Sequence, residues 1–180
     1  YILRRVNVLQ KSTAPSMRYI LGKKYFRQGK YLEVINLVSK GISDWHPVKP
    51  FALLLEASTL DVLKREDQAV EKFKECVSVS DSAIGRTTLP NRIKQLSITR
   101  DYCTVGVARA LFQSRKFSEA NLAYLDLSKK SYVWPEILFE EAWSSFYQKD
   151  FNRTLGKLVT YKAPILDFVF NPEIDVLRGL

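Results

Sequence analysis

The chain has 180 residues, of which 46% are hydrophobic and 12% aromatic, and its formal net charge at pH 7 is +9. This apolar content is ample for a continuous core in one or two domains and argues against intrinsic disorder. No apolar run approaches the roughly 18 residues of a membrane-spanning helix, so the sequence predicts no span within it.

The apolar pattern along the chain is that of helices. Seven glycines and seven prolines lie mostly between segments in which apolar residues recur every three or four positions. Few runs alternate apolar and polar residues as a half-buried strand does. We therefore predict an all-α fold.

Two helices joined by a tight turn are predicted near the start, after residues 1–14, which we expect to end an upstream helix. The first covers about residues 15–28, because Pro15 loses no hydrogen bond in a first helical turn. Gly29 then ends it, since glycine readily takes the left-handed conformation found after helix C-termini. The partner helix covers about residues 31–42.

A second pair of helices is predicted over residues 51–63 and 68–79. The pattern then lapses through the polar segment 81–89, which we interpret as an insertion. Pro90 opens a helix of about twenty-four residues, which is longer at its start than its neighbours need.

The rest of the chain continues the pattern of helix pairs. The long helix pairs with residues 117–128, and a fourth pair covers 135–148 and 151–161. From Asn171 the sequence echoes the start of the fourth pair, so residues 164–180 are interpreted as a linker and the start of a further unit. Because the chain opens and closes within an apolar pattern, we expect a piece of a longer protein.

Small residues recur at a nearly constant interval in the first helix of each pair, which marks a repeat. Ala57 follows Gly22 by thirty-five residues, and Ala142 follows Ala108 by thirty-four. The predicted organisation is repeats at 15–49, 50–80, 101–134 and 135–163, with an insertion and helix extension at 81–100.

This unit resembles the tetratricopeptide repeat, which has about 34 residues in two antiparallel helices. The matching positions are Leu21, Gly22, Tyr25, Gly29 and Tyr31 in the first unit, Ala57, Ala69, Phe73 and Cys76 in the second, Ala108, Phe117, Ala120 and Tyr124 in the third, and Ala142, Phe151 and Leu158 in the fourth. The resemblance implies a right-handed superhelical solenoid of antiparallel helix pairs. Residues 128–143 also resemble tetratricopeptide proteins of bacterial envelope and motility systems, which leaves a cytoplasmic and a periplasmic or envelope location open.

In this family the first helices line a concave groove that holds a peptide or a partner helix, so the resemblance implies a non-catalytic protein interaction scaffold. Carried over position by position, it implies a groove lined by Tyr19, Lys23, Phe26 and Arg27, by Leu54, Ser58 and Asp61, by Val105, Arg109, Phe112 and Gln113, and by Phe139, Trp143, Phe146 and Tyr147. Lys23, Arg27 and Arg109 would engage an acidic segment of an acidic or amphipathic partner, while the aromatic side chains hold its apolar ones. The alternative for each aromatic is a core position.

A second partner class follows from the net charge. Arg86, Arg92, Lys94 and Arg100 form the only concentrated basic patch, which would suit nucleic acid or an anionic membrane. The other basic residues are scattered among 19 acidic ones, which disfavours nucleic acid. A solvated helix face is the simpler explanation of the patch, and membrane contact could also come from regions outside the sequence.

Neither catalysis nor metal binding is predicted. The single histidine, His46, lies in a turn without a paired nucleophile or carboxylate, so we expect it to pack or to cap the turn. Cys76 and Cys103 have no metal-ligand spacing, and sparse cysteines favour free buried thiols over a disulfide. No cofactor is expected, since the sequence has no glycine-rich phosphate loop.

Overall fold

The computed structural model describes residues 14–160, 176, 177 and 179. Within these residues the protein is helical and has no strand, which confirms the predicted all-α class. The elements in chain order are α2 (Pro15–Arg27), α3 (Tyr31–Val38), α4 (Lys49–Val62), α5 (Glu66–Gly85), α6 (Pro90–Gln113), α7 (Phe117–Leu125), α8 (Trp134–Tyr147) and α9 (Phe151–Thr160).

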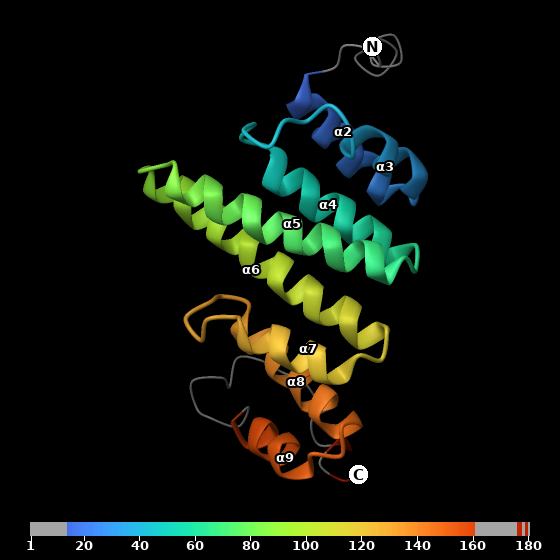
Figure 1. Cartoon of the computed structure of the whole chain (residues 1–180), viewed down its shortest axis with the longest axis vertical. Coiled ribbons are helices and arrows are strands. Elements are labelled where there is room, and N and C mark those ends of the chain that lie inside the picture. Colours follow the sequence, from blue (N-terminus) through green and yellow to red (C-terminus); the bar gives the residue numbers. More distant parts are fainter. Residues whose placement is uncertain (1–13, 161–175, 178, 180) are drawn as a thin grey trace.

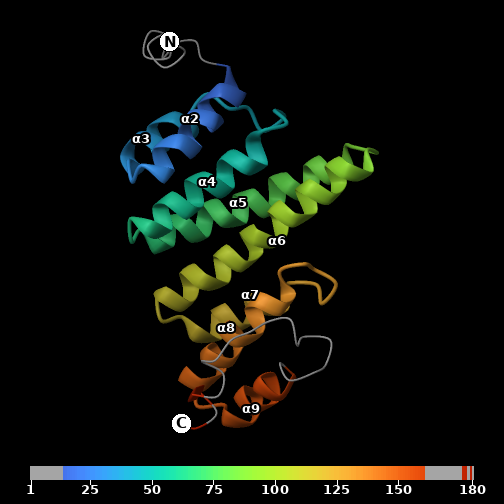
Figure 2. The same cartoon turned by 180° about the vertical axis from the view of Figure 1, so that it is seen from behind.

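The helices form one elongated stack in which each packs mainly on its neighbours in the sequence (Figure 1). Successive pairs are the hairpins α2–α3, α4–α5, α6–α7 and α8–α9. First helices of successive hairpins also touch, since α2 packs on α4 and α4 packs on α6. The reverse view in Figure 2 shows the same order from the first hairpin to the last.

All four hairpins turn in the same way. The residue two positions after the first helix has a positive φ in each: 72° at Gly29, 58° at Lys64, 59° at Arg115 and 63° at Lys149. The next amide N–H then donates to a carbonyl five residues back, as from Lys30 to Tyr25 at 3.0 Å. This is the hydrogen bond of a Schellman turn. A proline also lies in the first turn of α2, α4, α6 and α8, where its missing N–H costs no hydrogen bond.

The small residues of the repeat lie where helices approach closely. Ala57, Ala108 and Ala142 are fully buried. A Cβ added at Gly22 would lie only 3.0 Å from the Val38 side chain in α3 and 3.1 Å from that of Leu55 in α4. The hairpins therefore share both their turn and their close-contact positions, which is a repeat-like architecture.

The α5–α6 pair is longer than the sequence pattern predicts. The expected lapse at 81–89 is wrong for its first half, because α5 continues to Gly85 and the chain reverses within residues 86–89. The 24-residue helix α6, by contrast, is confirmed. The α5 and α6 helices pack on each other, and Ser80 of α5 and Leu96 of α6 are both buried, so this mostly polar part of the pair still has a packed side.

The expectation of free thiols is also wrong, because a disulfide joins Cys76 in α5 to Cys103 in α6. The antiparallel packing of the two helices brings their Cα atoms to 6.1 Å, within the range that a disulfide spans. Both cysteines are fully buried in the largest apolar cluster. Three residues after Cys103, Gly106 leaves room for the ring of Phe73.

Other boundaries shift by a few residues. The helix expected to reach residue 42 ends at Val38, and the one expected to reach 128 ends at Leu125. The predicted upstream helix at 1–14 and the predicted further unit at 164–180 lie almost entirely outside the described residues. No described helix is both long and apolar enough to cross a membrane.

Candidate functional site

A cavity of about 420 Å³ lies between α6 and α8, the first helices of the third and fourth hairpins. Its volume falls within the range of small-molecule and side-chain pockets. The side chains that line it are mostly aromatic: Phe112, Phe139, Trp143, Tyr147 and Tyr124, with Arg109, Gln113 and Glu140 as the other polar members.

The aromatic walls of the cavity are held by contacts between rings. Phe139, Trp143 and Tyr147 follow one another at intervals of four residues, so they share one side of α8. The ring of Tyr147 stacks on that of Phe117 at 4.9 Å and meets that of Phe112 edge-on at 5.7 Å. Trp143 is edge-on to Phe139 at 6.1 Å. Because bulky rings brace one another here, the walls are pre-formed.

One wall of the cavity carries an ion pair between α6 and α8. Arg109 donates from Nε to Glu140 Oε2 at 2.9 Å and from Nη2 to Oε1 at 2.6 Å. The Tyr124 hydroxyl donates to the same carboxylate at 2.9 Å. This two-pronged geometry is the strong form of an arginine–carboxylate contact. The charges of Arg109 and Glu140 therefore offset each other.

The environment of this pair changes the proton affinity of its neighbours. Burial, followed by the negative charge of Glu140, raises the pKa of the Tyr124 hydroxyl above its ordinary value of 10.0. The hydrogen bond to Glu140 raises the pKa of the Arg109 guanidinium. Both groups consequently keep their protons throughout the neutral range.

A second polar group continues from the cavity towards α4. Gln113 donates from Nε2 to Asp61 Oδ2 at 3.2 Å and accepts from Lys64 Nζ at 3.0 Å. Burial raises the pKa of the Asp61 carboxyl. These contacts connect the end of α4 to the end of α6, so Asp61 lies beside the cavity but does not line it.

Six predicted groove residues from the last two hairpins meet in this one cavity, Gln113 of the polar group above among them. The other five are Arg109, Phe112, Phe139, Trp143 and Tyr147. Phe146 lies just beyond it, edge-on to the Trp143 ring at 5.7 Å. These residues therefore lie on one surface, and their role in partner binding stays a prediction.

The predicted residues of the first two hairpins do not join them. Tyr19, Lys23 and Arg27 line a separate hollow of about 460 Å³ on α2. The ring of Phe26 packs edge-on against Tyr31 of α3 at 5.5 Å. On α4, Ser58 and Leu54 are both half-buried, and Leu54 packs against the main apolar cluster.

One predicted groove residue is wrong. Val105 is fully buried and belongs to the main apolar cluster, so it faces the core instead of solvent. The physical reason is that α4, α5 and α7 all pack on α6, so a position that the repeat pattern assigns to the groove can still be covered.

Two residues of the cavity, Tyr124 and Glu140, were not predicted. Tyr124 comes from the second helix of its hairpin, and the sequence pattern predicts it as a core residue. It is indeed only 2% exposed. The sequence does contain a signal for Glu140. It directly follows Phe139 and precedes Trp143 by three residues, so helical spacing places it beside two predicted groove residues. An acidic residue so placed can meet a basic one on the preceding first helix.

Other chemistry is sparse among the described residues. Residues 14–160 contain no cluster of three His, Cys, Asp or Glu side chains that could hold a metal ion. His46 accepts a hydrogen bond at Nδ1 from the Val48 amide at 3.2 Å, so it caps its own turn. The predicted basic patch lies elsewhere, where Arg86, Arg92 and Lys94 each contact an aromatic ring.

Comparison with known proteins adds no family to this description. No family model matches the chain, and a search of curated proteins finds no significant match.

Proposed function

We propose that the chain is a tetratricopeptide-like right-handed solenoid that acts as a non-catalytic protein interaction scaffold. Three observations support the repeat type: paired antiparallel helices, one Schellman turn per hairpin, and small residues at the close contacts between helices. Such stacks expose a continuous face made of first helices, which suits extended partners.

The observation that carries the proposal is the aromatic cavity between α6 and α8. Its walls are largely apolar and pre-formed, so a large apolar side chain can enter without much reorganisation of the protein. Tryptophan, tyrosine and arginine are the residue types that most often anchor interfaces, and Trp143, Tyr147 and Arg109 all line this cavity. The occupant is therefore a side chain of a partner peptide or helix.

The charges of the first hairpin and of the cavity suggest where the acidic and the apolar parts of that partner would bind. Because Glu140 offsets Arg109, the cavity itself favours an uncharged group. The first hairpin is strongly basic, since residues 14–43 hold six Lys or Arg and one acidic residue, Glu33. An acidic segment of the partner would thus lie along Lys23 and Arg27, with its apolar anchor in the cavity.

The same pairing supports binding over catalysis. Arg109, Glu140 and Tyr124 satisfy one another through direct hydrogen bonds, and the raised pKa values of Arg109 and Tyr124 keep both groups protonated at neutral pH. A general acid or base needs a pKa near the working pH.

Selection from a displayed random-peptide library would test the proposal. We expect enriched peptides to combine a large apolar residue with acidic residues, and we expect Trp143→Ala and Arg109→Glu to weaken their binding at least about tenfold. Trp45→Ala is the matched control, because Trp45 is also a surface tryptophan, 77% exposed, but lies outside the cavity. Equal affinity in all three variants, or no enriched motif, would refute the proposal.

A further inference from the structure

Three connections between hairpins lie along one edge of the stack. They are the segments 39–48 between α3 and α4, 86–89 between α5 and α6, and 126–133 between α7 and α8 (Figures 1 and 2). The α5–α6 turn projects furthest, because both of its helices are longer than their neighbours. This edge is distinct from the aromatic cavity.

The projecting turn and the helix starts beside it carry positive charge only. Residues 82–100 contain Arg86, Arg92, Lys94 and Arg100 and no Asp or Glu. Nearby acidic groups are already paired: Asp44 with Lys49 at 3.0 Å, and Asp81 with Arg100 at 3.4 Å. The edge therefore keeps a net positive potential.

Each of three cations on this edge lies over an aromatic ring. The Arg86 guanidinium is 4.3 Å from the centre of the Trp45 ring, and the Lys94 ammonium is 5.2 Å from that of Tyr132. Arg92 lies 5.1 Å from the Phe51 ring and also donates to the Pro47 carbonyl. These cation–π contacts join the projecting turn to the connections on either side of it.

Large apolar side chains are unusually exposed beside these cations. Trp45 is 77% exposed, Tyr132 is 72% exposed and Leu89, at the tip of the projecting turn, is 66% exposed. They come from three separate connections, and the cation–π contacts tie Trp45 and Tyr132 to the α5–α6 turn and the start of α6, where Leu89 lies. We define the basic edge as Trp45, Arg86, Leu89, Arg92, Lys94 and Tyr132.

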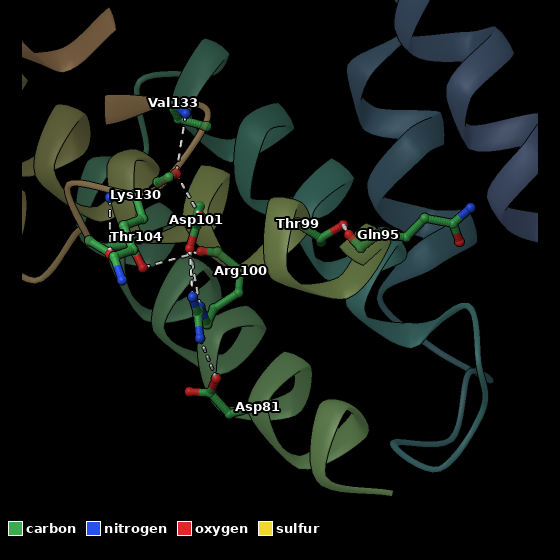
Figure 3. Close-up of polar contacts among 10 residues, drawn as sticks. Asp81, Gln95, Thr99, Arg100, Asp101, Thr104, Lys130 and Val133 are labelled. Atoms are coloured by element: carbon green, nitrogen blue, oxygen red, sulfur yellow. Dashed lines mark hydrogen bonds and ion pairs between the residues drawn. The ribbon is translucent and has the colours of Figure 1, made fainter. Parts of the chain in front are cut away.

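A buried polar network fixes the connection that carries Tyr132. Asp101, which is only 8% exposed, accepts hydrogen bonds from Arg100 at 2.9 Å and from the Ser131 hydroxyl at 2.6 Å. Ser131 Oγ in turn accepts the Val133 amide N–H at 3.2 Å. Figure 3 shows Arg100 between Asp101 and Asp81, so the network also reaches α5. The position of Tyr132 is thus set by the fold.

We propose that the basic edge binds the surface of an anionic lipid bilayer. Exposed tryptophan and tyrosine rings favour the interface between lipid headgroups and hydrocarbon, and an exposed leucine at a tip can enter the hydrocarbon. Lys and Arg beside them gain attraction from anionic headgroups. The exposed apolar side chains therefore suit the hydrocarbon boundary, and the surrounding cations suit the anionic headgroups.

The shape of the edge favours a bilayer over nucleic acid. Single-stranded nucleic acid is held in grooves that track its backbone, with bases stacked on open rings. Here the cations lie on one projecting turn and on the start of α6, and one face of the Trp45 and Tyr132 rings is covered by Arg86 and Lys94. The Leu89 side chain offers no charge or hydrogen bond to a phosphate.

Co-sedimentation with vesicles tests this proposal independently of peptide binding. We expect the protein to sediment with vesicles that contain phosphatidylglycerol and not with pure phosphatidylcholine vesicles. The double variant Arg86→Glu/Lys94→Glu should lower the partition coefficient at least about tenfold, because it removes two attractions and adds two repulsions. Trp45→Ala/Tyr132→Ala should also lower it, while its circular dichroism remains that of the folded protein.

The matched control is Lys23→Glu/Arg27→Glu, which changes the net charge equally on α2. This variant should retain most vesicle binding, as should Trp143→Ala. If both charge-reversed doubles lose binding equally, the attraction is only that of net charge and the proposal is wrong. The proposal is also overturned if the protein does not sediment with phosphatidylglycerol vesicles. It is overturned as well if the residues of the basic edge bind a single-stranded RNA homopolymer instead of vesicles.

Discussion

The two sides of α6 pack against their neighbours in opposite ways: closely against α5, and with a cavity left open against α8. Towards α5, Gly106 admits the ring of Phe73 so closely that an added Cβ would lie 2.4 Å from a ring carbon. The Cys76–Cys103 bond closes the same side. Towards α8, large rings brace one another around a cavity of about 420 Å³, and the Arg109–Glu140 ion pair and the Phe112–Tyr147 ring contact join the two helices.

The difference shows how one helix can serve both stability and binding. Small residues allow close approach, and close approach buries apolar surface at high density. Large rings on both α6 and α8 prevent such approach, so apolar surface remains accessible to a ligand. We expect substitutions on the α5 side to change the free energy of unfolding and those on the α8 side to change binding.

The largest effect is expected where α5 and α6 are closest. Phe73→Ala should lower the free energy of unfolding by about 4 kcal/mol, because it removes a buried ring that the helices cannot fully collapse upon. Phe112→Ala, on the cavity side, should cost less than half as much, since Phe112 is only half-buried. Urea unfolding monitored by circular dichroism measures both, and equal losses would contradict the contrast between the two sides.

A double-mutant cycle sharpens this point. Gly106→Ala alone should be destabilising, because its methyl group would overlap the Phe73 ring. In the Phe73→Ala background the same methyl group has room, so the two losses should not add. Strict additivity would mean that the ring and the glycine do not share that space.

Removing the disulfide is expected to have the next largest effect. The bond joins residues 27 apart in the sequence, and by chain entropy its loss should lower the free energy of unfolding by about 3 kcal/mol. The double variant Cys76→Ser/Cys103→Ser avoids a free thiol and can be compared with the wild-type protein under reducing conditions. Peptide binding should remain unchanged in the folded variant, and its loss would show that the α5 side shapes the cavity.

The smallest effect concerns pH and the cavity side. The Tyr124 hydroxyl keeps its proton in the folded protein to higher pH than in the unfolded chain, where its pKa is near 10.0. Above that pH the unfolded chain loses the proton first, so stability should fall by up to about 1.4 kcal/mol per pH unit. Tyr124→Phe should remove this alkaline loss, as measured by urea unfolding on either side of about pH 10.

A matched control for the pH effect is Tyr19→Phe. Burial also raises the pKa of Tyr19, but this residue is only half-buried and no carboxylate contributes to the change in its pKa. Its replacement should therefore leave most of the alkaline loss in place. A profile that Tyr19→Phe flattens more than Tyr124→Phe would contradict our account of the cavity.

The sequence predicted the helices well where an apolar period was strong. The 24-residue helix from Pro90 is an example, because its apolar residues recur along the whole length. The end of α5 was missed, since two helices that project from a stack need only a narrow apolar strip between them. The disulfide was missed for a related reason: it depends on the register of α5 against α6, which no local pattern encodes.

The candidate site was predictable in its rings and not in its polar contacts. Phe139, Trp143 and Tyr147 share one helix face, so helical spacing alone places them together. Tyr124 reaches the cavity from a second helix while almost wholly buried, and Glu140 gains its role only through Arg109 on another hairpin. Contacts between hairpins depend on how far apart the first helices stand, and this distance is a property of packing.

The cross-link in the middle of the stack also has a mechanical consequence. Each hairpin contacts mainly its neighbours, so a force applied at the two ends would release the outer hairpins separately. The Cα atoms of Cys76 and Cys103 are 6.1 Å apart, and the 27-residue separation between them corresponds to roughly 90 Å of extended chain. That length stays hidden from the force until a reductant cuts the bond, so the protein would be shorter under tension in an oxidising medium than in a reducing one.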